Sequence, residues 1–195
     1  MNFIQRFLQK IRLRAQQKSL ALRASQQKIE RRRLDTDAAK TVGILFDATQ
    51  AAHQEQVLHF AEQLIKKGKK VRLLGYIHAP TPKKVEGAKL NFPHFYKNEM
   101  SSSGTLKSTV AEDFIQQKFD VLFGLYPNSQ FALDYVGAAS LAYSKIGPHC
   151  EQFPDGYDLM IDAGQNADLQ HFIKQLNFYT HQLQSRRAQK YEATI

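Results

Sequence analysis

Short apolar runs alternate with amphipathic stretches between residues 41 and 185. Unbroken apolar runs are typical of strands buried on both faces, whereas apolar residues spaced three and four apart are typical of helices. The runs that predict strands are residues 42–46 (VGILF), 71–77 (VRLLGYI), 119–126 (FDVLFGLY), 143–146 and 158–161. Strands that alternate with helices predict an α/β fold, with a Rossmann-like or flavodoxin-like, mostly parallel sheet of about five strands and helices on both faces.

Capping signals place some of the helix ends. Gly68 is expected to close the first helix of this region, and Thr109 with Glu112 has the spacing of a capping box. We expect Asn166 to cap the last helix. The apolar face expected for that helix is Leu169, Phe172, Ile173, Leu176, Tyr179 and Leu183. Residues 79–107 carry little pattern beyond a short strand at 89–92.

The first 33 residues differ from the rest of the chain. Residues 2–33 contain no proline or glycine and are rich in good helix formers, which predicts one long helix or two helices. Apolar residues at its start have helical spacing: Phe3, Ile4, Phe7, Leu8 and Ile11. Residues 34–40 have the character of a linker. The expected organisation is a helical arm and linker over 1–40, an α/β domain over 41–185, and a polar, fraying tail over 186–195.

The net charge of +9 is concentrated in the arm. Ten basic residues lie there with a single acid, Glu30, so the rest of the chain is neutral overall. The ten are Arg6, Lys10, Arg12, Arg14, Lys18, Arg23, Lys28, Arg31, Arg32 and Arg33. A neutral domain that carries a cationic arm predicts a non-enzymatic protein that binds a polyanion, with RNA or the ribosome as the first hypothesis.

Binding of this kind would depend on phosphates more than on bases. Each phosphate contact releases counterions and makes binding sensitive to salt. The arm lacks interleaved aromatic residues for base stacking, so shape and backbone would be recognised. A second basic cluster can extend the surface: Lys66, Lys67, Lys69, Lys70 and Arg72, with Lys83 and Lys84 near in sequence. The competing interpretation is a solvated helix whose charges serve solubility.

The apolar start of the arm permits other partners. Phe3 to Ile11 with flanking cations also fit a helix that lies on an anionic membrane surface, or that binds a protein partner. For those five apolar residues alone, packing on the chain's own domain or on a second copy is the favoured interpretation. The oligomeric state stays open.

A third hypothesis places a small-molecule site or an enzyme at the carboxyl ends of the strands. The candidates are Asp47, Thr49, Asn128 and Ser129, with His78, His149 and Asp162 at other strand ends. Asp47 is interpreted first as a helix cap and second as an acid or base, and Asn128 and Ser129 likewise as a helix start.

Motifs of established chemistry are missing from the sequence. It has no glycine-rich phosphate loop, no nucleophile elbow and no paired ligands for zinc, so we expect no cofactor, no metal and no catalytic residue. Cys150 is the lone cysteine, and it is interpreted as a small structural or surface thiol and not as a nucleophile. No apolar run approaches the roughly 18 residues that span a bilayer, and cations interrupt the start, so a cytoplasmic location is expected.

The order of motifs resembles an uncharacterised family of small bacterial α/β proteins. The matching pieces are the basic N-terminal helix, TVGILFDA, KKGKKVRLLGY, KFDVLFGLY, AASLAYSKIG and FIKQLNFYTHQL. The resemblance extends from residue 1 to about residue 183. It implies the α/β fold with a basic N-terminal helix, and it supplies no site residues.

Overall fold

A computed structural model describes residues 3–26, 30–80, 90–151, 153–162, 164 and 168–192. It contains one six-stranded sheet in which all strand pairs are parallel, in the order β3-β2-β1-β4-β5-β6. The strands are β1 (Thr41–Asp47), β2 (Lys70–Ile77), β3 (His94–Tyr96), β4 (Val121–Leu125), β5 (Ser144–Pro148) and β6 (Leu159–Ile161). This is the strand order of a Rossmann-type sheet, whose topological switch point lies between β1 and β4. The predicted α/β class and Rossmann-like arrangement are confirmed.

Strand β3 is the strand that the sequence did not predict. It pairs with β2 through Gly75–Ile77 and makes six strands where about five were expected. The short strand expected at 89–92 is wrong for residues 90–92, which form no strand, and residue 89 lies outside the described residues. Only three residues of β3 pair, immediately after Pro93, so the segment is too short to show a periodic pattern.

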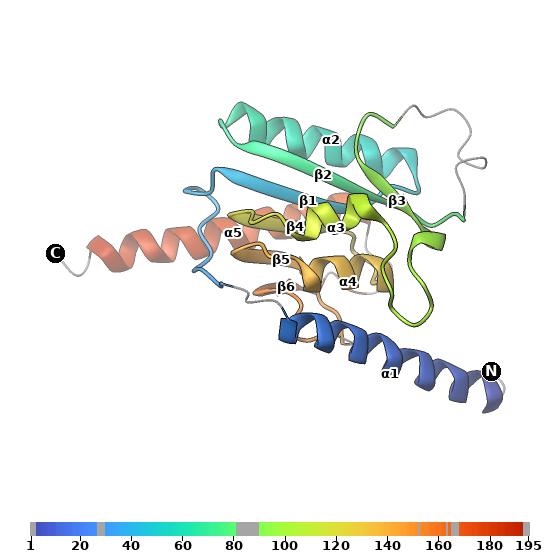
Figure 1. Ribbon diagram of the computed structural model, residues 1–195. Helices are drawn as coiled ribbons and strands as arrows, with labels where there is room; N and C mark the ends of the chain where they lie inside the picture. Colours follow the sequence, from blue (N-terminus) through green and yellow to red (C-terminus); the bar gives the residue numbers. More distant parts are fainter. Residues whose placement is uncertain are drawn as a thin grey trace.

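Helices cover both faces of the sheet (Figure 1). They are α1 (Phe3–Gln26), α2 (Ala51–Lys66), α3 (Thr109–Ile115), α4 (Phe131–Ala139) and α5 (Leu169–Glu192), with a 3-10 turn at Lys97–Glu99. Successive side chains of a strand point to opposite faces. Accordingly Ile44 and Phe46 pack with α2 and α5 in one apolar core, and Leu45 packs with α3 and α4 in the other.

Two helices begin or end at other residues than expected. Ser108, not Thr109, precedes α3, and its hydroxyl accepts from the Ala111 amide at 3.4 Å. Helix α5 continues to Glu192, so the fraying tail expected from residue 186 is helical as far as residue 192. Asn166 lies outside the described residues. The Asp168 carboxylate accepts from the His171 amide at 2.6 Å at the start of α5.

The second half of α5 extends beyond the sheet (Figure 1). Leu169, Phe172 and Leu176 are buried as expected, whereas Tyr179 and Leu183 of the same predicted face are exposed. The apolar face of α5 therefore stops contributing to the core before the helix itself ends. The segment expected as a linker instead joins the core, because Leu34 packs against it and Ala39 is buried.

Candidate polyanion-binding surface

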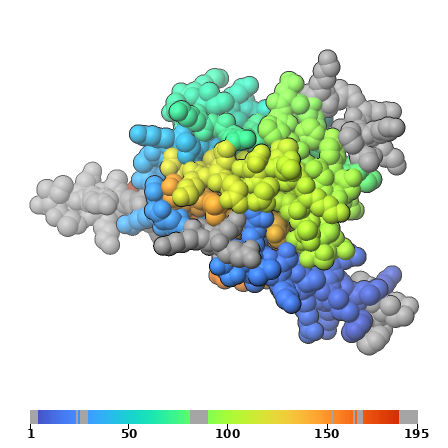
Figure 2. All heavy atoms as spheres, viewed as in Figure 1, coloured from blue at the N-terminus to red at the C-terminus, as the bar shows by residue number. Residues whose placement is uncertain are grey.

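The first half of α1 projects from the domain. Residues 5–12 are all exposed, and the helix runs out beyond the sheet on the side opposite the end of α5 (Figures 1 and 2). Four exposed cations recur every fourth residue along it: Arg6, Lys10, Arg14 and Lys18. At a rise of about 1.5 Å per residue, neighbouring members of this row lie about 6 Å apart along the axis. Arg12 is also exposed, on another side of the helix.

An apolar stripe runs beside this row. The exposed fractions of Phe7, Leu8 and Ile11 are 56%, 57% and 49%. Packing on the chain's own domain, the first alternative of the favoured interpretation, is therefore wrong for these three residues, whereas packing on a second copy stays a prediction. The side chains of Phe3 and Ile4 lie outside the described residues.

A different face of α1 contacts the domain. Gln16 is buried and donates to the Ser102 carbonyl at 3.2 Å, and the Ser19 hydroxyl donates to the Gly104 carbonyl at 2.8 Å. Gly104 has a φ of +90°, and a Cβ there would come within 3.2 Å of the Cα of Gln16. The close approach of α1 thus depends on a glycine. The docked face combines these polar contacts with Leu20, which packs against the core formed by α3 and α4, and the apolar stripe lies in solvent.

Arg23 belongs to the docked face and not to the exposed row. Its guanidinium donates to the Glu112 carboxylate at 2.5 Å, and its side chain is only 16% exposed. The hydrogen bond from Arg23 lowers the pKa of Glu112, against an opposing effect of burial. Arg23 can reach a phosphate only after this ion pair breaks, so we assign it to α1 docking. Lys28 of the predicted set lies outside the described residues.

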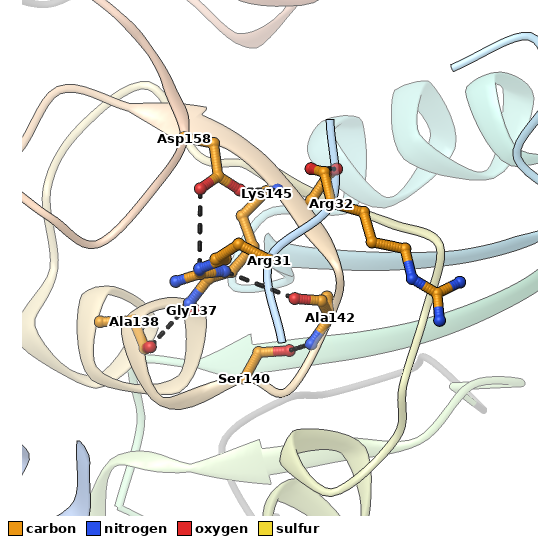
Figure 3. Close-up of polar contacts among 9 residues, drawn as sticks. Arg31, Arg32, Gly137, Ala138, Ser140, Ala142, Lys145 and Asp158 are labelled. Carbon is orange, nitrogen blue, oxygen red and sulfur yellow. Dashed lines mark hydrogen bonds and ion pairs between the residues drawn. The ribbon is translucent and has the colours of Figure 1, made fainter. Parts of the chain in front are cut away.

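Arg31 and Arg32 anchor the end of the arm at the start of β5. The Arg32 amide donates to the Tyr143 carbonyl at 2.9 Å, and its guanidinium lies 3.5 Å from the centroid of the Tyr143 ring. The Arg31 guanidinium lies 3.6 Å from the Asp158 carboxylate. Figure 3 shows the two guanidinium groups pointing in opposite directions, Arg31 towards Asp158 and Arg32 away from it. Arg33 is exposed beside them.

Beneath this anchor lies a lysine that the sequence analysis did not single out. Lys145 of β5 is fully buried, and its ammonium donates to the carbonyls of Gly137 and Ala138 at the end of α4, at 2.9 and 2.7 Å (Figure 3). Burial lowers the pKa of Lys145 well below its usual range. Cations are favoured at a helix C-terminus, so Lys145 caps α4. The signal in the sequence is a lysine inside an otherwise apolar strand, Ser144–Pro148.

The second basic cluster lies where the strands begin. Lys66, Lys67, Lys70 and Arg72 are exposed around the start of β2. Lys69 is held inward, because its ammonium donates to the carbonyls of Asp37 and Ala39 at 3.0 and 2.8 Å. Lys83 and Lys84 lie outside the described residues.

The candidates at the opposite, carboxyl edge of the sheet are largely engaged with their neighbours. Asp47 accepts from the Thr49 amide at 2.9 Å and from the Gln130 amide side chain at 2.5 Å. Its predicted role as cap of α2 is wrong, since Gln50 precedes that helix without a side-chain cap. Thr49 accepts from the His78 amide at 3.0 Å. These contacts tie the ends of neighbouring strands together.

Ser129 leads to a buried polar cluster. Its hydroxyl donates to the Asp134 carboxylate at 2.6 Å, and it lies 3.7 Å from the sulfur of Cys150. Neither it nor Asn128, which is exposed, begins α4, because Gln130 precedes that helix. Beside Ser129 and Asp134, the hydroxyls of Tyr126 and Tyr157 are 2.5 Å apart.

Asp134 is the residue of this cluster that the sequence analysis missed. It is 2% exposed, and burial raises its pKa to about 6 although hydrogen bonds, the first from Ser129, oppose the shift. A carboxylate within the apolar helix Phe131–Ala139 was the available signal. Cys150 is buried beside it, which agrees with a structural thiol.

The described part of the chain holds no group of three or more His, Cys, Asp or Glu residues placed to bind a metal. Among the same residues, no helix is both long enough and apolar enough to cross a membrane.

Comparison with known proteins gives one result. The model of a family of unknown function (DUF6913) matches residues 12–183, which includes the docked half of α1 together with the α/β domain. The chain belongs to this family. Searches of curated proteins and of solved structures each found no match.

Proposed function

We propose that this member of the DUF6913 family is a non-enzymatic polyanion-binding protein that associates with RNA, free or in the ribosome, through the exposed cations of α1. The observation that carries the proposal is the row Arg6, Lys10, Arg14 and Lys18. Like charges four residues apart destabilise a helix by about 0.2–0.5 kcal/mol per pair. A row of four such cations on a projecting helix therefore lowers the stability of the helix. Binding of a ligand that neutralises these charges would relieve the repulsion between them.

The ligand that fits this row is a phosphate backbone. Its charges repeat along a line, as the cations do, and their neutralisation releases counterions. Phe7 is the one aromatic residue among the described side chains of this row, between Arg6 and Lys10, so base stacking would be slight and binding tolerant of sequence. Structured RNA, whose grooves are recognised through shape and backbone, suits such a helix.

The test compares two charge-matched variants. Lys10→Gln/Arg14→Gln removes two members of the row, and Lys107→Gln/Lys174→Gln removes two exposed cations elsewhere. Affinity for a fluorescent RNA hairpin is measured from low to high salt. For the row variant, we expect the slope of log affinity against log salt to become shallower by about one to two units, with little change for the control. Equal slopes in both variants, or no RNA binding by the wild type, would contradict the proposal.

An anionic membrane surface is the second candidate, and the exposed Phe7, Leu8 and Ile11 favour it. An amphipathic helix with cations beside an apolar stripe can lie at a lipid headgroup boundary. Sedimentation with vesicles that contain phosphatidylserine tests this candidate. Binding that Phe7→Glu/Ile11→Glu abolishes, and that neutral vesicles do not support, would move the membrane to first place. RNA is placed ahead of the membrane because further exposed cations, Lys70 and Arg72, lie at the start of β2 on the domain, away from the stripe of α1.

A further inference from the structure

The first half of β2 is an open edge of the sheet. Strand β3 pairs only with Gly75–Ile77, so within the described residues Lys70 to Leu74 have a strand neighbour only on the β1 side. Lys70 and Arg72 stand on this open half and are exposed. Cations on an open edge also prevent edge-to-edge pairing of sheets, and this is the competing role for them.

A groove lies between the start of β2 and the end of α3, and Thr41 of β1 also lines it. It has a volume of about 740 Å³ and is lined by Lys70 and Arg72 of β2 and by the segment that joins α3 to β4. That segment contributes Lys118, which is exposed, together with Gln116 and Gln117. One acid, Asp113, lies among three cations. The groove thus combines net positive charge with amide side chains, which suits phosphate and ribose oxygens.

Hydrogen bonds connect the groove to the anchored end of the arm. The Lys70 amide donates to the Lys40 carbonyl at 2.8 Å, and the Lys40 amide donates to the Asp120 carboxylate at 2.9 Å. Ser144 continues the path, since its amide donates to the Asp120 carbonyl at 3.2 Å and its hydroxyl to the Arg32 carbonyl at 2.7 Å. The strand starts therefore place the groove cations and Arg32 at the same end of the sheet, although Lys70 and Lys118 lie 38 and 86 residues after Arg32 in the sequence.

Asp120 is the acid that lies between the groove and Arg32, and its carboxylate accepts hydrogen bonds from within the fold. Asp120 accepts from the amides of Lys40 and Thr41 and from the Thr41 hydroxyl, all at 2.8–2.9 Å. Hydrogen bonds from Thr41 and Lys40 lower the pKa of Asp120 against an opposing effect of burial. Its charge is directed at the backbone of β1. No ion pair to Lys70, Arg72 or Lys118 occurs among the described residues, so these cations face solvent.

We infer that this groove is a second phosphate-contact site, which holds a separate backbone segment of the same RNA that α1 binds. The inference rests on the proposed function and extends it. The projecting row of α1 and the groove lie on different parts of one body, and α1 alone is about 36 Å long at 1.5 Å per residue. A short oligonucleotide can occupy only one of the two sites, whereas a folded RNA of several helical turns can reach both. The protein therefore selects extended, structured RNA over short strands.

The experiment uses the full chain with two RNAs, a structured RNA of several helical turns and a single-stranded 8-mer. Lys70→Gln/Lys118→Gln is compared with the charge-matched control Lys107→Gln/Lys174→Gln and with the α1 variant Lys10→Gln/Arg14→Gln. With the long RNA, we expect the groove variant to lose affinity several-fold at 0.1 M salt and to flatten the salt slope by one to two units, on the order of one per lost contact. With the 8-mer we expect a smaller change.

The outcomes separate the two proposals. If the α1 variant loses binding and the groove variant matches the control with both RNAs, the groove inference fails and the proposed function stands. If the wild type binds neither RNA, both fail. If Lys70 and Lys118 instead prevent edge-to-edge pairing of sheets, the groove variant will aggregate. In that case, hydrogen exchange of the wild-type protein with and without RNA tests the inference. Slower exchange at residues 70–74 and 116–118 on RNA binding supports the inference, and unchanged exchange there overturns it.

Discussion

Arg23 of α1 and Glu112 of α3 form an ion pair across 89 residues of sequence, with a guanidinium–carboxylate distance of 2.5 Å. This contact fixes the helical arm on the domain, and the hydrogen bonds of Gln16 and Ser19 support it from the same face. The arm therefore has a docked half with a fixed direction and a projecting half that presents its side chains to solvent.

Removal of this ion pair should loosen α1 without unfolding the sheet. We expect Arg23→Ala and Glu112→Ala to be non-additive, with a coupling energy of about 0.5–1 kcal/mol, since Glu112 is partly exposed. Denaturant unfolding of the two single variants and the double variant measures it. Hydrogen exchange at residues 13–23 should quicken in each single variant. Full additivity together with unchanged exchange would mean that the pair does not hold the helix.

The buried carboxyl of Asp134 should make stability fall as pH rises from about 4 to 6. Its folded pKa of about 6 lies above the usual unfolded value of about 3.9, so the folded state holds the proton more tightly. The stabilisation is complete below pH 4 and is lost as pH passes through 6, by at most about 3 kcal/mol. Asp134→Asn should flatten the profile, as measured by denaturant unfolding across this range.

Ser129 provides the matched control for that experiment. Its hydroxyl donates to the Asp134 carboxylate and favours the ionised form. We expect Ser129→Ala to extend the loss of stability to higher pH, because the pKa of Asp134 rises further. A profile that shifts to lower pH in Ser129→Ala would show that the hydrogen bond does not favour the carboxylate.

Lys145→Met should destabilise the fold by about 2 kcal/mol. The substitution keeps an unbranched side chain of similar length but removes the donor to the Ala138 carbonyl and leaves the Gly137 carbonyl with only the Ser140 amide at 3.4 Å. Thermal unfolding of Lys145→Met beside Lys174→Met, at an exposed position on α5, gives the comparison. Equal unfolding temperatures for the two variants would rule out a capping role for the ammonium.

Polar substitutions in the apolar stripe of α1 should leave stability nearly unchanged. Phe7 and Ile11 are about half exposed, and exposed substitutions usually shift the free energy of unfolding by less than about 0.5 kcal/mol. Thermal unfolding of Phe7→Glu and Ile11→Glu, compared with the buried Phe172→Ala, tests this. A fall for Phe7→Glu like that for Phe172→Ala would mean that the stripe packs against protein, in the same chain or in a second copy.

Sequence patterns predicted the parts of this fold that depend on local periodicity. The run VGILF of β1 is buried on both faces, and a strand of this kind can be identified without its neighbours. Strand β3 could not be predicted, because its three paired residues belong to the sheet only through β2. Likewise, local sequence does not reveal that Tyr179 and Leu183 stay exposed whereas Leu176 of the same predicted face packs in the core.

The sequence predicted which cations the candidate surface could contain, but it did not predict which of them are exposed. The cations of the arm were countable from the sequence, but Arg23 and Arg14 look alike there. Only the folded chain brings Glu112 to Arg23 and leaves Arg14 exposed. The groove at β2 brings Lys70 and Lys118 together from segments that are far apart in sequence, which no local pattern encodes.

The anchoring of Arg31 and Arg32 at β5 determines how the molecule would respond to force. A pull on the N-terminus first loads the docking contacts of α1, such as Arg23 with Glu112. It then reaches the contacts of Arg31 with Asp158 and of Arg32 with Tyr143. Strand β1, which lies at the centre of the sheet and follows directly in the chain, is loaded only after these contacts break. Tension on a bound α1 would thus be taken up at the docked face of α1 and then at the residues just before β5 and β6, and it would spare the central strands.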